Sequence, residues 1–144
     1  TDVQKGYLIM IPFEFIVEGP PVSLQTKNRN RLQEWKARVR SAAELYWPTE
    51  DSPSDKQLKL SITYYYENTS PDVDNIIKPI QDALVGLVYN DDDQIIDTSC
   101  GKRDINGSFK IRGASPVLVK GFVEGNEFLF VSVVEITDLE EVRP

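Results

Sequence analysis

LKLSITYYY, residues Leu58–Tyr66, alternates apolar and polar side chains and predicts a β-strand with one buried face. A polar loop follows, and then Asn75–Val88, where isoleucine, alanine, leucine and valine recur every three or four residues. That spacing predicts an amphipathic helix. Pro79 lies in its first turn or just past it, removes one backbone hydrogen bond and can bend the helix. A strand followed by such a helix indicates a domain in which helices pack on a sheet.

The rest of the chain continues this mixture of strands and helices. Residues Arg29–Trp47 carry apolar side chains at helical spacing, and Pro48 ends the predicted helix. Four more segments are rich in apolar, β-branched or aromatic residues and are predicted strands: Tyr7–Val17, Gln94–Lys102, Val117–Val123 and Glu127–Ile136. We therefore expect an α/β (α+β) domain, in which a mixed sheet of about five strands carries two main helices on one face. The tyrosines at the end of the first strand and Trp35 are expected in the core.

The composition excludes several kinds of active site. The 144 residues include no histidine and one cysteine, Cys100. Histidine acid–base catalysis, zinc sites and cysteine–histidine nucleophile pairs are therefore excluded. Any hydrolytic chemistry would have to use carboxylates, lysine and a metal ion. The length predicts a single domain over residues 1–144, with an acidic tail at about 137–144.

Two features bear on where the protein works. No run of about 18 uncharged apolar residues could span a membrane, and the first residues lack the pattern of a signal peptide. A single cysteine also excludes a disulfide within the chain. We therefore expect a cytoplasmic protein with no membrane partner.

The charge is unevenly distributed. The net charge of −7 argues at first against a nucleic-acid partner. However, residues 27–40 hold six basic residues and a single acid, Glu34. Such donors suit phosphate oxygens, although a solvated helix face would look the same. The candidate DNA contacts are Lys27, Arg29, Arg31, Lys36 and Arg38. A second, weaker basic stretch contains Lys102, Arg103, Lys110 and Arg112.

Two acidic clusters flank the helix predicted at Asn75–Val88. PDVDNIIK (Pro71–Lys78) lies at its start, and NDDDQ (Asn90–Gln94) follows its end. If the helix and the turn after it fold back, carboxylates from both clusters meet, with Lys78 one turn into the helix. Convergent carboxylates without histidine or thiol suit Mg²⁺, which prefers oxygen ligands and keeps waters for a phosphate substrate.

Each cluster also has a simpler interpretation. Asp72 and Asp74 could cap a helix N-terminus, and the aspartates after Asn90 could form a solvated turn. Lys78 follows Asp74 by four residues and could be its ordinary helical ion-pair partner. These interpretations do not explain why both clusters sit at opposite ends of one apolar helix.

Together these residues resemble the RusA family of Holliday junction resolvases. The resemblance rests on Asp72-Val73-Asp74-Asn75 with Lys78, then Asp82-Ala83-Leu84, then Asp91-Asp92, one residue and Gln94. It implies a homodimeric, magnesium-dependent endodeoxyribonuclease that resolves four-way DNA junctions by symmetric paired nicks during recombination and repair. Two-fold symmetry would present two sites to two strands of the junction.

The resemblance also implies roles for individual residues. Asp72, Asp74 and Asp92 would bind the metal, Mg²⁺ or Mn²⁺ in its place, with Asp91 beside them. Lys78 would stabilise charge on the phosphate or assist the leaving group. Two other functions remain open: a non-catalytic acidic binding module, and another magnesium-dependent phosphoesterase acting on nucleotides. A glycine-rich phosphate loop, which would favour the latter, is not visible.

Overall fold

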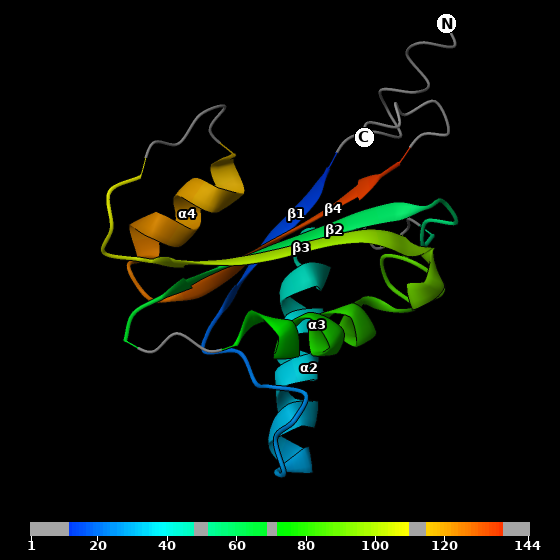
Figure 1. The fold of residues 1–144 in the computed structure, drawn as a ribbon. Helices are drawn as coiled ribbons and strands as arrows, with labels where there is room; N and C mark the ends of the chain where they lie inside the picture. Colours follow the sequence, from blue (N-terminus) through cyan, green and yellow to red (C-terminus); the bar gives the residue numbers. More distant parts are fainter. Residues whose placement is uncertain (1–11, 48–51, 69–71, 110–114, 137–144) are drawn as a thin grey trace, which may run out of the picture.

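The computed structural model describes residues 12–47, 52–68, 72–109 and 115–136 (Figure 1). Within these ranges the chain forms an α+β fold of four strands and three α-helices, with two short 3₁₀-helices. In chain order the elements are β1 (Phe13–Glu18), α2 (Arg29–Glu44), β2 (Leu58–Tyr66), η1 (Val73–Asn75), α3 (Ile77–Leu84), η2 (Asp92–Gln94), β3 (Ile95–Asp104), α4 (Pro116–Glu124) and β4 (Phe128–Glu135).

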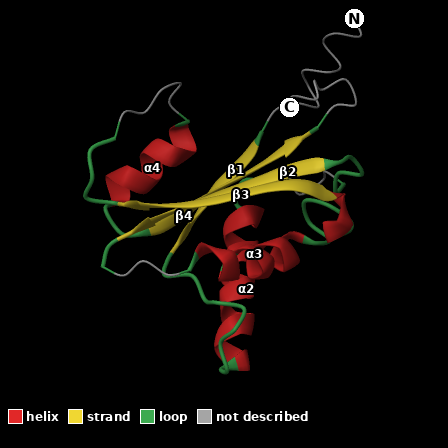
Figure 2. Cartoon of the chain, in the orientation of Figure 1, coloured by secondary structure: helices red, strands yellow, loops and turns green. Residues whose placement is uncertain are grey.

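The strands form one mixed sheet in the order β1-β4-β2-β3. β2 pairs in parallel with β3 and antiparallel with β4, and β4 pairs antiparallel with β1. The strands β1 and β3 are therefore the edges of the described sheet. The α2 and α3 helices lie on one face, and α4 lies on the other (Figures 1 and 2).

The expected number of strands is wrong, because Val117–Val123 is helical within α4. Its β-branched, apolar sequence favours a strand, but its ends favour a helix. The Ser115 side chain accepts a hydrogen bond from the Leu118 N–H at 3.3 Å, and Pro116 is the first helical residue. Gly125 then ends the helix with φ of 79°. These are the usual start and stop signals of a helix, and they outweigh the strand propensity.

The long helix expected at Asn75–Val88 is also wrong in extent. It is divided into η1 and the eight-residue α3. Pro79 lies in the first turn of α3, where its missing N–H is tolerated. After α3 the backbone becomes extended at Val85, and Gly86 turns with φ of 87°. The shorter helix leaves enough chain to return toward its own start.

The core lies between the sheet and the α2–α3 pair. Trp35 and Val39 of α2, Ile80 of α3 and Tyr64 of β2 are at most 1% exposed, which confirms the expected core position of Trp35. Asn28 caps α2 by accepting a hydrogen bond from the Arg31 N–H at 3.0 Å. The amphipathic helix predicted for this region is confirmed, although it ends at Glu44.

The opposite face is held by an aromatic cluster beneath α4. Tyr65 of β2 packs against Phe122 of α4 and Phe128 of β4, with ring centroids 4.8 Å away in both cases. A Cβ at Gly121 would lie 2.5 Å from the Phe128 ring, so α4 approaches the sheet closely because this residue has no side chain. Among the described helices, none has the length and apolar character needed to cross a membrane.

Candidate active site

The first acidic cluster forms a tight turn that leads into α3. The Asp72 side chain accepts a hydrogen bond from the Asp74 N–H at 3.1 Å and so caps η1. Both carboxylates are exposed, whereas Ile76 is buried and fixes the turn to the core. The capping interpretation of Asp72 is therefore confirmed, but capping uses one carboxylate oxygen and leaves the group open to solvent.

The same turn faces the edge strand β3, against which η1 packs. Burial and the nearby negative charge of Asp74 raise the pKa of the half-buried Cys100 thiol to about 11. Cys100 pairs in register with the buried Ile62, so it lies on the face of the sheet that α2 and α3 cover. Asp74 is thus held between the start of α3 and the middle of β3.

The second acidic cluster is a capped turn whose geometry depends on one glutamine. The Gln94 side-chain oxygen accepts hydrogen bonds from the Asn90 and Asp91 N–H groups at 2.9 and 3.0 Å. The Asp91 carboxylate accepts from the Asp93 N–H at 2.9 Å, and Asp91 and Gln94 together form a capping box. The Gln94 amide also donates to the carbonyls of Ser54 and Lys56 at 2.8 and 2.9 Å. Gln94 therefore fixes both the shape of this turn and its place beside the loop before β2.

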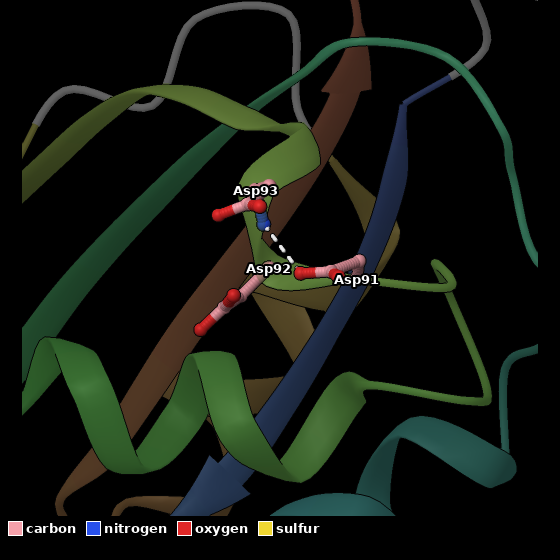
Figure 3. Close-up of side chains that lie close together, drawn as sticks. All are labelled: Asp91, Asp92 and Asp93. Carbon is pink, nitrogen blue, oxygen red and sulfur yellow. Dashed lines mark hydrogen bonds between the residues drawn. The ribbon is translucent and has the colours of Figure 1, made fainter.

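Lys78 connects the start of α3 to the second acidic cluster. Its ammonium donates a hydrogen bond to Asp92 Oδ2, and the Asp92 side chain points toward α3 in Figure 3. This contact raises the pKa of Lys78 and lowers the pKa of Asp92. The chain does fold back after α3, as the two-cluster hypothesis requires. Because Lys78 lies one turn beyond Asp74, both acidic turns are placed near the start of α3.

The partner of Lys78 on its own helix differs from the expected one. The ion pairs of Lys78 among the described residues are with Asp82, at 3.0 Å, and with Asp92. The i,i+4 pair therefore runs forward to Asp82 rather than back to Asp74. Lys36 of α2 lies 3.5 Å from the other oxygen of Asp82.

The carboxylates are grouped mainly within the second cluster. Among the described residues, the group of three acidic side chains with an oxygen from each within 4.8 Å of the others is Asp91, Asp92 and Asp93. Figure 3 shows Asp92 directed to the helix and the other two flanking it. Asp72 and Asp74 are not part of this group.

The basic segment begins beside the first acidic turn. The Leu24 N–H donates to the Asn75 carbonyl at 2.9 Å, which attaches the loop before α2 to η1. Three of the candidate DNA contacts are exposed at this end of the helix: Lys27, Arg29 and Arg31. The loop that leads to these cationic groups is therefore attached to the turn that exposes Asp72 and Asp74.

The other two candidate DNA contacts interact within the protein. Lys36 is half-buried and pairs with Asp82. Arg38 donates to the Glu18 carbonyl at 2.5 Å and lies over the Trp35 ring, 5.3 Å from its centroid. Arg38 is nevertheless exposed along part of its length. Of the weaker basic stretch, Lys110 and Arg112 lie outside the described residues, as does the predicted acidic tail.

Comparison with known proteins decides the family. The family described as "Endodeoxyribonuclease RusA" matches residues 20–112, which is well over half of the chain and includes both acidic turns. This chain belongs to the RusA family. The RusA match begins just after β1 and ends before α4, so it contains α2, β2, α3 and β3. The resemblance found in the acidic motifs is therefore confirmed at the level of the family.

A curated relative gives a shorter match. The "Uncharacterized protein YqaN" of Bacillus subtilis (strain 168) is 50% identical to this RusA-family chain over 34 residues. The match covers 24% of this chain and 24% of the relative. This chain thus aligns with about a quarter of the relative's length.

The candidate site has the donor chemistry that a hard divalent cation requires. Asp72, Asp74 and Asp92 offer carboxylate oxygens, and each is at least partly open to solvent. The cationic ammonium of Lys78 already lies against Asp92, which shows that this oxygen accepts a positive partner. Magnesium prefers such oxygen ligands. The donor chemistry therefore suits Mg²⁺ or Mn²⁺, but Asp72 and Asp74 lie outside the group of carboxylates that gathers around Asp92.

The sequence indicated no structural role for two residues of this candidate site. Gln94 was recognised by its spacing, but two of its four side-chain hydrogen bonds go to carbonyls of a loop about 40 residues earlier in the chain. Asp82 follows Lys78 by four residues, a signal that the sequence did contain. Its contact with Lys36 depends on the packing of α2 against α3, which the sequence alone did not indicate.

Proposed function

We propose that this protein is a magnesium-dependent, structure-selective endodeoxyribonuclease that resolves four-way (Holliday) junctions by symmetric paired nicks in recombination and repair. The observation that carries the proposal is the fold-back of the chain after α3. It brings Asp92 against Lys78 at the start of the helix, next to the turn that holds Asp72 and Asp74. Membership of an endodeoxyribonuclease family supports the same chemistry.

The proposed metal ligands are Asp72, Asp74 and Asp92, with Asp91 beside them. When bound there, Mg²⁺ would supply Lewis-acid chemistry, namely polarisation of the scissile phosphate and activation of a water nucleophile. Asp91 and the capping box hold the Asp92 backbone in place. Lys78 would leave Asp92 for the phosphate oxygens and stabilise the charge that develops in the transition state.

The exposed cations at the start of α2 supply the DNA-binding surface in this proposal. The loop that leads to Lys27, Arg29 and Arg31 is attached to η1 through Leu24, so we place the bound DNA backbone across the start of α2 and the carboxylates. Contacts of this kind bind phosphates without reading sequence. A homodimer would present two such sites to opposite strands of a junction and so produce paired nicks.

The test is nicking of a labelled four-way junction, compared with a linear duplex of the same sequence. The full chain is assayed with Mg²⁺, with Mn²⁺ and with a chelator. We expect paired nicks in the junction that need the metal and are much weaker in the duplex. Equal cutting of both substrates would make the protein a nuclease without junction selectivity. An intact junction under every condition would favour the non-catalytic binding module, and release of phosphate from nucleotides would favour the phosphoesterase.

A further inference from the structure

Asp82 occupies an unusual place between two lysines from different helices. Its Oδ1 lies 3.0 Å from the Lys78 ammonium on its own helix, α3. Its Oδ2 lies 3.5 Å from the Lys36 ammonium on α2. The ammonium of Lys78 in turn contacts Asp92. Four charges of alternating sign, Lys36, Asp82, Lys78 and Asp92, therefore run from the basic helix to the second acidic turn.

We propose that Asp82 is a positioning residue, which holds the Lys78 ammonium in place at the active site and limits its hold on Asp92. This inference rests on the proposed function, because it assigns Asp82 a part in the same chemistry. A lysine side chain carries its ammonium group on a flexible stem of four carbons. It therefore needs a fixed partner to keep one position. Asp82 supplies that partner from one turn away.

The surroundings of Asp82 make it more rigid than an ordinary surface acid. Arg40 of α2 donates to the carbonyls of Ala83 and Val85 at 3.4 and 2.8 Å, which fixes the end of α3 immediately after Asp82. Tyr89 is fully buried, and its hydroxyl donates to the Gln81 carbonyl at 2.6 Å. Isolated exposed ion pairs have little effect because both side chains move. Here the backbone of the acid is held, and a second lysine orients its carboxylate.

The position of Lys78 matters because its ammonium contacts the carboxylate of Asp92, a proposed metal ligand. Lys78 has two carboxylate partners. The ion pair with Asp82 therefore competes with the ion pair between Lys78 and Asp92 and weakens it. Without the Asp82 charge, Asp92 would be the remaining partner. The ammonium would then bind Asp92 more tightly and would be displaced less readily by a cation or drawn less readily to a phosphate.

The experiment compares four proteins: wild type, Asp82→Asn, Lys78→Gln and the double variant. Nicking of the junction is measured in a single turnover at saturating enzyme, and junction affinity is measured separately. We expect Asp82→Asn to slow nicking about 10- to 100-fold, as a misplaced catalytic group does, with little change in affinity. The double variant should be no slower than Lys78→Gln, because Asp82 acts through Lys78. Asp82→Glu should recover part of the lost rate.

A second assay measures binding of Mn²⁺ alone by electron paramagnetic resonance, without DNA or turnover. Asp82→Asn should weaken Mn²⁺ binding about tenfold in the presence of Lys78, and much less in the Lys78→Gln background. Glu124→Gln at the end of α4 removes the same charge on the other face of the sheet and should change neither assay.

The outcomes separate this inference from the proposed function. If the wild type does not cut the junction, the proposed function fails and the Mn²⁺ assay alone decides. Wild-type nicking or wild-type Mn²⁺ binding by Asp82→Asn would overturn the positioning role. The positioning role would also be overturned if the free-energy losses of Asp82→Asn and Lys78→Gln simply added in the double variant. Additive losses would show that Asp82 acts independently of Lys78.

Discussion

Both faces of the sheet bury apolar side chains, but the surface above them differs. On the α4 face, aromatic rings from Tyr65, Phe122 and Phe128 pack around a glycine. On the other face, the rim of the α2–α3 layer carries ion pairs and side-chain hydrogen bonds, from Lys36 through Lys78 to Gln94. The family match stops at residue 112, before α4. The comparison teaches that the candidate site lies on the face that also holds the main core, while α4 adds packing on the opposite face.

The largest effect is expected from Asp92→Asn on the charged face. The substitution keeps the volume but removes a proposed metal ligand and the anionic partner of Lys78. Junction nicking should fall about a thousandfold or more, which corresponds to several kcal/mol of lost transition-state stabilisation. Thermal unfolding should change little, because this carboxylate is at the surface of the fold. A fully active variant would remove Asp92 from the site.

The next largest effect should come from Gly121→Val on the aromatic face. Its side chain would collide with the Phe128 ring and force α4 away from the sheet. We expect the free energy of unfolding to fall by about 1–3 kcal/mol, as measured by urea denaturation. Nicking per folded molecule should stay near that of the wild type. Val123→Ala, at an exposed position of the same helix, is the matched control. An activity loss larger than the stability loss would contradict the separation of the two faces.

Replacing Arg29 and Arg31 by glutamine tests the exposed start of α2. Both side chains are predicted to contact phosphates, so junction affinity should fall about tenfold. The slope of log affinity against log salt should become shallower by about two, one for each lost contact. Lys120→Gln on α4 removes an exposed cation from the other face and should leave the slope unchanged. Equal effects of the two changes would mean that only the total charge matters.

The smallest effect concerns the reactivity of Cys100. Its pKa of about 11 leaves about one thiol in a thousand ionised at pH 8, so alkylation by iodoacetamide should be slow. The rate should rise about tenfold per pH unit until the pH approaches the pKa. Asp74→Asn removes a negative charge that raises this pKa, so it should speed alkylation at pH 8. Glu124→Gln should not. If Asp74→Asn has no effect, the two groups are farther apart than the structure places them.

The sequence correctly predicted the helices and strands in which the apolar periodicity and the residues at both ends indicate the same type of element. The strand Leu58–Tyr66 and the helix starting at Arg29 show one periodicity each, and the structure confirms both. The region Val117–Val123 failed because its composition favours a strand while Ser115, Pro116 and Gly125 favour a helix. The predicted helix Asn75–Val88 was too long because Gly86 could not be recognised as its end from apolar spacing alone.

Those parts of the candidate site that depend on motifs close together in the sequence could be predicted. The spacing of the two acidic clusters indicated the fold-back, and the contact between Lys78 and Asp92 bears it out. The metal ligands Asp72, Asp74 and Asp92 stay a prediction, as do the DNA contacts. The bridge from Asp82 to Lys36 depends on how two helices cross, and no local pattern specifies that crossing.

Gln94 has a consequence for how this protein can change over time. Its amide recognises two main-chain carbonyls, those of Ser54 and Lys56, and no side chain of that loop. An insertion or deletion within Ser54–Gln57 would therefore move both carbonyls and the aspartates with them. Side chains in this segment can change with less effect, apart from Ser54, whose hydroxyl accepts from the Lys56 N–H and donates to Glu135.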